Sequence, residues 1–330
     1  MKLMEDYNHF DTRQESPVSG FIVTKILQYV NATNIEVSGA KVLLLVDNFM
    51  DAENFYRRLI QSQHDWTNIH FFSNEKQAFA WIRKNRDRVS DIYTYSDYGL
   101  NFESLLWHLP SVVVHVYEEG IGTYFNSLLK EHRMIKNTLI RIYALLSGNE
   151  IKFGGNKRTS EIIIYKKDFH AQQVKFRKTK QRSTFKKPFV NHFSEIMHLF
   201  EPLDEELKGI TSQNILVYIP SWNIQSIDQQ KDSYDLKIIK PHPHLKNLGD
   251  HVDGYDYSIP ASVPAELLLL QLVGNNNQIT VVSHYSTATL YFRNFPKICF
   301  IDIQDHVRRY ELDKIFLELA QEVIQENFYF

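Results

Sequence analysis

Residues 21–46 read FIVTKILQYVNATNIEVSGAKVLLLV and combine segments of different periodicity. Two continuous apolar runs, Phe21–Val23 and Lys41–Val46, are typical of strands that are buried on both faces of a sheet. Between them, Lys25–Asn31 has the spacing of a helix. A strand, a helix and a second strand in this order predict a βαβ unit with parallel strands.

The same alternation continues through the first half of the chain. We expect further elements at Asn74–Lys84 (helix), Asp91–Tyr95 (strand), Phe102–His108 (helix), Ser111–Tyr117 (strand) and about Tyr124 to Leu146 (long helix). The region Ser147–Lys187 then breaks the rhythm with several glycines and a basic run. We expect it to contain one short strand, Glu161–Tyr165, followed by an interdomain linker.

A second alternating series follows. It comprises the apolar runs Asn214–Ile219, Leu236–Ile239, Ala265–Val273, Ile279–Val282 and Ile298–Ile301, a helix from about Ser286 and a terminal helix at Tyr310–Gln325. A chain of 330 residues also exceeds the size of a single core. The sequence therefore predicts an α/β protein with two Rossmann-like, doubly wound domains, at residues 1–187 and 188–330. Ligands of such domains bind in the cleft at the carboxyl ends of the strands.

The composition excludes several classes of protein. The 37 basic and 39 acidic residues nearly cancel, so no overall field attracts nucleic acid. Cys299 is the only cysteine, which favours a reducing compartment. Met1–Ser19 lacks the pattern of a signal peptide, and no run of 18 apolar residues occurs. We expect a cytoplasmic protein, with peripheral attachment to the inner membrane as the alternative.

Two adjacent acids stand at the end of the strand expected at Ser111–Tyr117. Glu118 and Glu119 are followed by Gly120, which suits a turn facing a cleft. One carboxylate could accept a proton from an attacking hydroxyl, and repulsion between the two would raise the pKa of one of them. The alternative is that both acids only favour the positive end of the following helix.

A second candidate site follows the strand Leu236–Ile239, at Lys240-Pro241-His242-Pro243. The prolines restrict the backbone around His242, and a fixed imidazole next to Lys240 suits an anion such as a phosphate. A solvated proline turn is the alternative. The spacing of His242 and His244 could also suit a metal ion, but no Cys or carboxylate cluster nearby completes such a site, so we expect no metal.

Two further candidates lie at expected helix starts. Ser286 and Thr287 follow a strand and open a helix, where unpaired N–H groups and hydroxyls can hold a phosphate. Glu266 lies in the first turn of another helix, where its carboxylate could bind two ribose hydroxyls. Ordinary helix capping is the alternative for Ser286 and Thr287.

In this order, the motifs resemble those of the bacterial sialyltransferases and polysialyltransferases of glycosyltransferase families 52, 38 and 80. Those families carry an acid-acid-glycine motif, then a His-Pro motif and then a Ser-Ser/Thr pair. The matching residues are Glu118-Glu119-Gly120, His242-Pro243 and Ser286-Thr287. The opening segment Phe21–Gln28 is similar as well, although Thr-Lys-Ile-Leu-Gln replaces the usual Thr-Pro-Leu-Gln.

The resemblance implies a GT-B fold and metal-independent, inverting transfer of sialic acid from CMP-sialic acid to a galactose-type sugar. The acceptor would be an oligosaccharide or a lipid-linked glycan of the bacterial surface. Glu118 would be the base, with Glu119 as the alternative. His242 would assist departure of CMP, Ser286 and Thr287 would hold its phosphate, Glu266 its ribose, and Lys240 would add charge.

Two other functions remain open at the level of sequence. The same scaffold could use another CMP-linked acid sugar, such as Kdo, legionaminic acid or pseudaminic acid. The basic run Lys175–Lys187 could instead indicate a non-catalytic protein that binds polyanions or glycans, or could bring the chain to anionic lipids.

Overall fold

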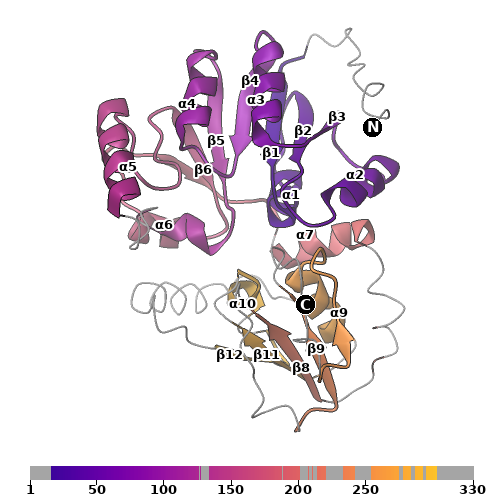
Figure 1. Ribbon diagram of the computed structural model, residues 1–330. Helices are drawn as coiled ribbons and strands as arrows, with labels where there is room; N and C mark the ends of the chain where they lie inside the picture. The colour runs from indigo at the N-terminus through magenta and orange to yellow at the C-terminus, as the bar shows by residue number, and fades with distance from the viewer. Residues whose placement is uncertain are drawn as a thin grey trace.

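The computed structural model describes residues 16–125, 127, 134–187, 189–200, 207, 210, 214–220, 233–241, 254–274, 278–283, 287–292 and 295–302. These residues form two parallel β-sheets, each flanked by helices (Figure 1). The expectation of two Rossmann-like domains is confirmed.

The first sheet has seven parallel strands in the order β3-β2-β1-β4-β5-β6-β7. Their bounds are β1 (Val18–Val23), β2 (Ala40–Val46), β3 (Asn68–Phe72), β4 (Val89–Thr94), β5 (Val113–Tyr117), β6 (Thr159–Ile163) and β7 (Gln181–Ser183). The strand order reverses between β1 and β4, so the loops after these two strands border the crevice in which such sheets bind ligands.

Helices connect these strands. They are α1 (Ile26–Thr33), α2 (Ala52–Gln61), α3 (Glu75–Lys84), α4 (Leu100–Trp107), the 3₁₀ turn η1 (Ile121–Tyr124), α5 (Met134–Ser147) and α6 (Lys167–Gln173). The apolar runs are continuous because both faces of the sheet are covered. Phe21 and Leu43 belong to the core on one face, and Ile22 and Leu44 to the core on the other.

The second sheet has five described parallel strands in the order β10-β9-β8-β11-β12. Its strands are β8 (Asn214–Ile219), β9 (Leu236–Ile239), β10 (Tyr257–Ser258), β11 (Gln278–Ser283) and β12 (Ile298–Asp302). The described helices of this half are α7 (Phe189–Ile196), η2 (Met197–Leu199), α9 (Ala265–Gly274) and α10 (Thr287–Phe292).

Helix α7 joins the two halves, because it packs against α1 of the first and α9 of the second (Figure 1). Its residues Phe189 and Phe193 are buried in a core that also contains Phe21 from β1 and Leu267 from α9. The two sheets therefore share one continuous apolar core, which fixes the loops at their facing ends relative to each other.

Two sequence-based expectations were wrong in detail. The helix expected from Tyr124 begins only at Met134 among the described residues, since η1 ends at Tyr124 and Phe125 is extended. The region expected to be a linker after β6 contains α6 and β7, and β7 pairs with β6 as the last strand of the sheet. The expected terminal helix, Tyr310–Gln325, lies outside the described residues.

Candidate active site between the two domains

The candidate site begins where β5 ends, at Glu118 and Glu119. The Glu118 N–H donates to the Ile163 carbonyl (2.9 Å), which extends the pairing of β5 with β6 by one residue. Beyond it the chain turns at Gly120, whose φ of 120° is in the region that favours glycine. This turn places both acids at the carboxyl end of the first sheet.

Glu118 points into the protein and is completely buried. Its carboxylate accepts hydrogen bonds from the Tyr124 hydroxyl (2.6 Å), the Tyr165 N–H (2.9 Å) and the Tyr291 hydroxyl. Burial raises the pKa of Glu118, and the hydrogen bonds from Tyr124, Tyr291 and Tyr165 oppose this shift. Because Tyr291 lies on α10, this carboxylate connects the first domain to the second.

Glu119 has a different environment. Its side chain is 20% exposed, and its carboxylate accepts a hydrogen bond from Gln28 Nε2 (3.2 Å) and lies 3.6 Å from Lys25 Nζ. Burial raises the pKa of Glu119, and Lys25 and Gln28 oppose the rise. We expected repulsion between the two acids to be the cause of such a shift, whereas burial is the leading cause for both. Glu119 is thus an accessible carboxylate with an increased proton affinity.

The turn from β1 into α1 supports both acids. Gln28 accepts hydrogen bonds from the N–H (2.7 Å) and hydroxyl (3.0 Å) of Thr24, which orients its amide nitrogen toward Glu119. Asn31 Nδ2 donates to the Glu118 carbonyl (2.7 Å). Sequence reasoning assigned no role to Gln28 or Asn31. Thr24 and Gln28 both lie in the opening segment Phe21–Gln28, so that segment contained the relevant signal.

In the second domain, Lys240 and Glu266 come together. Lys240 follows β9 and Glu266 lies in the first turn of α9, and both are buried. The Lys240 ammonium donates to the carbonyl oxygens of Pro241 and Ala261. Burial lowers the pKa of Lys240 to about 8, an effect that nearby Glu266 opposes. Burial also raises the pKa of Glu266, and Lys240 opposes that rise.

The remaining sequence candidates are not placed. His242, Pro243 and Ser286 lie outside the described residues, as does the side chain of Thr287, which is the first residue of α10. Within the described part of the chain, no three His, Cys, Asp or Glu side chains gather in a way that could hold a metal ion.

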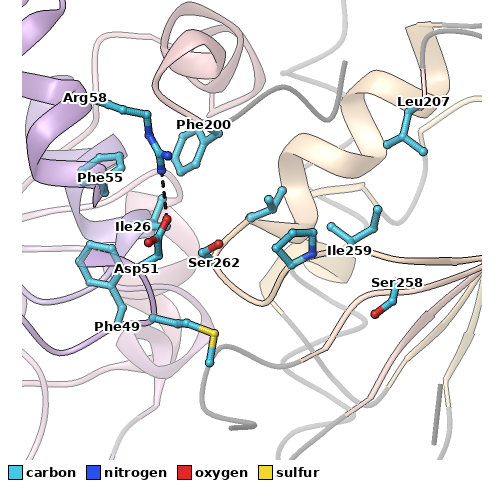
Figure 2. Close-up of a pocket in the computed structure, with 13 residues that line it drawn as sticks. Ile26, Phe49, Asp51, Phe55, Arg58, Phe200, Leu207, Ser258, Ile259 and Ser262 are labelled. Atoms are coloured by element: carbon cyan, nitrogen blue, oxygen red, sulfur yellow. Dashed lines mark hydrogen bonds and ion pairs between the residues drawn. The ribbon is translucent and has the colours of Figure 1, made fainter. Parts of the chain in front are cut away.

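A cavity of about 230 Å³ lies between the two domains (Figure 2). The first domain lines it with Ile26, Phe49 and the Asp51–Arg58 ion pair (3.4 Å), and the second with the loop after β10. Ile26 is the neighbour of Lys25, which contacts Glu119. The loop includes Pro260 and Ser262, which flank the Ala261 carbonyl that Lys240 contacts. The cavity therefore adjoins the segments that carry both halves of the candidate site.

The chain gives no significant match to a protein-family model or to a curated protein sequence. Its structure is similar to that of an α/β-galactoside α-2,3-sialyltransferase from the luminous marine bacterium Photobacterium phosphoreum, with 10% identity and a TM-score of 0.55 over 95% of this chain and 98% of that one. It is also similar to S. aureus MnaA in a co-structure with UDP, with 7% identity and a TM-score of 0.52 over 94% and 88% of the two chains. These similarities support the expected GT-B arrangement of two Rossmann-like domains.

No helix among the described residues is both long enough and apolar enough to cross a membrane.

Proposed function

We propose that the chain is an inverting glycosyltransferase that moves sialic acid from CMP-sialic acid to a terminal galactose-type sugar of a bacterial surface glycan. The observation that carries the proposal is Glu119. It is a partly exposed carboxylate with a raised pKa at the carboxyl end of β5, in a GT-B fold. The ordered motifs shared with bacterial sialyltransferases add the choice of donor.

Glu119, rather than Glu118, is the base in this proposal. A general base must reach the proton that it abstracts, and its pKa should approach the working pH. Glu118 is fully buried and already accepts three hydrogen bonds, so it has no access to an acceptor hydroxyl. Glu119 is accessible, and Gln28 and Lys25 fix its orientation.

The reaction is a displacement at the anomeric carbon of the sialic acid. The acceptor oxygen forms a bond to this carbon from one face while the bond to the CMP phosphate oxygen breaks on the other face. Glu119 takes the proton from the acceptor hydroxyl, and the bonding electrons leave with CMP. Attack opposite the leaving group inverts the anomeric configuration.

The second domain would hold the donor. His242 would donate a hydrogen bond or a proton to the departing phosphate, and Ser286 and Thr287 would bind the same phosphate. Glu266 would bind the ribose hydroxyls, and the Lys240 ammonium would add positive charge beside them. A single phosphate carries less charge than a diphosphate, so these groups can stabilise it without a metal ion.

The test is incubation of the protein with CMP-Neu5Ac and a panel of galactose- and GalNAc-terminated acceptors, with products read by mass spectrometry. Glu119→Gln should lower transfer by about 10²-fold or more, the usual contribution of a general base, while CMP binding persists. His242→Ala should weaken both transfer and CMP binding. The matched control is Glu53→Gln, which removes an exposed carboxylate on α2.

Three results would change the proposal. Full activity of Glu119→Gln together with loss of activity in Glu118→Gln would return the role of base to Glu118. Turnover of CMP-Kdo, CMP-legionaminic acid or CMP-pseudaminic acid, but not of CMP-Neu5Ac, would keep the reaction and change the sugar. Turnover of a UDP-sugar alone would overturn the assignment of the nucleotide.

A further inference from the structure

Helix α5 presents a row of large apolar side chains to the solvent. The exposed fractions are 63% for Leu139, 50% for Ile142, 73% for Leu145 and 82% for Leu146. Spacings of three and four residues place these side chains on one side of the helix, whereas Ala144 is buried on the other. Single exposed apolar residues are common, but a contiguous row of this kind usually marks an interaction surface.

Positive charges lie on this helix and near its end. Helix α5 contains no Asp or Glu, and Arg141 is exposed on its outer side. The basic run noted in the sequence lies next to the end of the helix, where Lys175, Arg177 and Lys178 are exposed. The function proposed above gives this run no role.

Contacts with residues 150–152 hold the basic run in place, a few residues after α5 ends at Ser147. The Lys152 ammonium donates to the Lys175 carbonyl, and the Arg177 N–H donates to the Glu150 carboxylate (2.9 Å). Glu150 is also paired with Lys152 (3.3 Å), and its side chain is only 13% exposed. The first carboxylate after the end of α5 is therefore already paired.

We propose that this surface binds to an anionic lipid bilayer. This α5 surface comprises Leu139, Arg141, Ile142, Leu145, Leu146, Lys175, Arg177 and Lys178. The helix would lie in the plane of the membrane with its apolar row at the boundary of headgroups and acyl chains, and the cations would contact anionic headgroups. With 14 residues, α5 is about 21 Å long, shorter than the hydrocarbon core of about 30 Å.

Charge distinguishes a bilayer from a second copy of the chain as the occupant. Two copies that met through the α5 surface would bring like charges together, because the helix supplies no carboxylate to pair with Arg141 and the basic run. An anionic bilayer offers both the apolar layer and the counter-charges.

The test is sedimentation of the full chain with vesicles, and it does not depend on the proposed function. We expect the protein to bind vesicles of equimolar phosphatidylcholine and phosphatidylglycerol, to bind phosphatidylcholine alone much more weakly, and to lose binding as salt increases. The double variant L145S/L146S should reduce the partition coefficient at least about 10-fold. The triple variant K175E/R177E/K178E should reduce it about 100-fold or more.

Matched controls lie elsewhere in the first domain. Ile60→Ser removes a 41% exposed side chain from α2, and K76E/K84E reverses two exposed charges on α3. Both should bind as the unchanged protein does, and circular dichroism should show that all variants are folded. Wild-type binding in both α5-surface variants, or no binding of the unchanged protein, would overturn the proposal. So would a dimer, seen by light scattering, that L145S/L146S abolishes while vesicle binding is absent.

Discussion

Removal of one hydroxyl, in Tyr291→Phe, tests whether Glu118 holds the two domains together. Tyr291 donates from α10 of the second domain to the Glu118 carboxylate, which also accepts from Tyr124 and from the Tyr165 N–H of the first. Phenylalanine keeps the ring, which stacks on Phe189 with centroids 3.8 Å apart and planes 13° from parallel. The substitution therefore removes the hydrogen bond and leaves the packing.

The free energy of unfolding that Tyr291→Phe loses depends on whether the Glu118 carboxyl group is charged. A hydrogen bond to a charged group contributes about 1.5–3 kcal/mol and one between neutral groups about 0.5–1.5 kcal/mol. Burial raises the pKa of Glu118, and the Tyr291 hydroxyl opposes this rise. The pKa of Glu118 should therefore be still higher in the Tyr291→Phe variant. A raised folded-state pKa gives stability that is present below the unfolded value and is lost as pH rises through the folded value. The difference in unfolding free energy between the variant and the unchanged protein should therefore increase as pH rises.

Urea unfolding followed by circular dichroism measures this gap. We expect a loss of about 0.5–1.5 kcal/mol at pH 4, where the carboxyl group is neutral, and a loss that increases toward about 1.5–3 kcal/mol as pH rises through the folded pKa of Glu118. The matched control is Tyr257→Phe, at a half-buried position on β10, which should change the free energy of unfolding little at any pH. If Tyr291→Phe loses no more free energy than Tyr257→Phe at any pH, the Glu118–Tyr291 contact does not stabilise the domain interface.

Two further predictions concern pH. Lys25→Met should move the acidic limb of the pH–rate profile of transfer to higher pH, because Lys25 opposes the rise in the pKa of Glu119. If the acidic limb does not move, Glu119 is not the titrating base. His115 bridges Asp91 and Glu161 at 3.0 Å each, and although burial lowers its pKa, these contacts outweigh burial and raise it. The stabilisation by protonated His115 is present below the unfolded pKa of 6.5 and is lost as pH rises through the folded pKa. His115→Gln should therefore lower the free energy of unfolding at pH 6 and lower it much less at pH 9. An equal loss at both pH values would show that the charged form of His115 does not stabilise the fold.

The central strands were predictable because their side chains pack alternately into the two cores on opposite faces of the sheet. Neighbouring positions in β1 and β2 point to opposite faces, both of which are covered, so apolar side chains occur without interruption. The same signal identified β8, β9 and β11 in the second domain. The start of α3 was predictable for a different reason, since the Asn74 side chain accepts a hydrogen bond from the Gln77 N–H in the usual manner of a helix cap.

The last strand of the first sheet was not predictable from its composition. Residues 181–183 of β7 are Gln, Arg and Ser, and none of them is fully buried. This strand exists because β6 offers a free edge, and polar residues suit an edge that faces water. Nothing in the local sequence separates such a segment from a basic linker.

Long-range contacts set a second limit on what the sequence could reveal. Glu118 and Tyr291 are 173 positions apart, and their contact requires that both domains be folded and joined. The Gln28–Glu119 contact similarly depends on β1 and β5 ending at the same edge of one sheet. Local periodicity finds the strands, but it does not show which loops meet.

The adjacent acids illustrate how far a motif determines roles. The Glu118 N–H continues the pairing of β5 with β6, so the chain is still extended there, and successive side chains of an extended chain point to opposite sides. One acid of such a pair must face inward when the other faces the cleft. Which one does so depends on where Tyr165 and Tyr291 supply donors for a buried carboxylate. The acid-acid-glycine motif thus predicts one buried and one accessible carboxylate, and the contact of Tyr291 on α10 with Glu118 identifies Glu118 as the buried one.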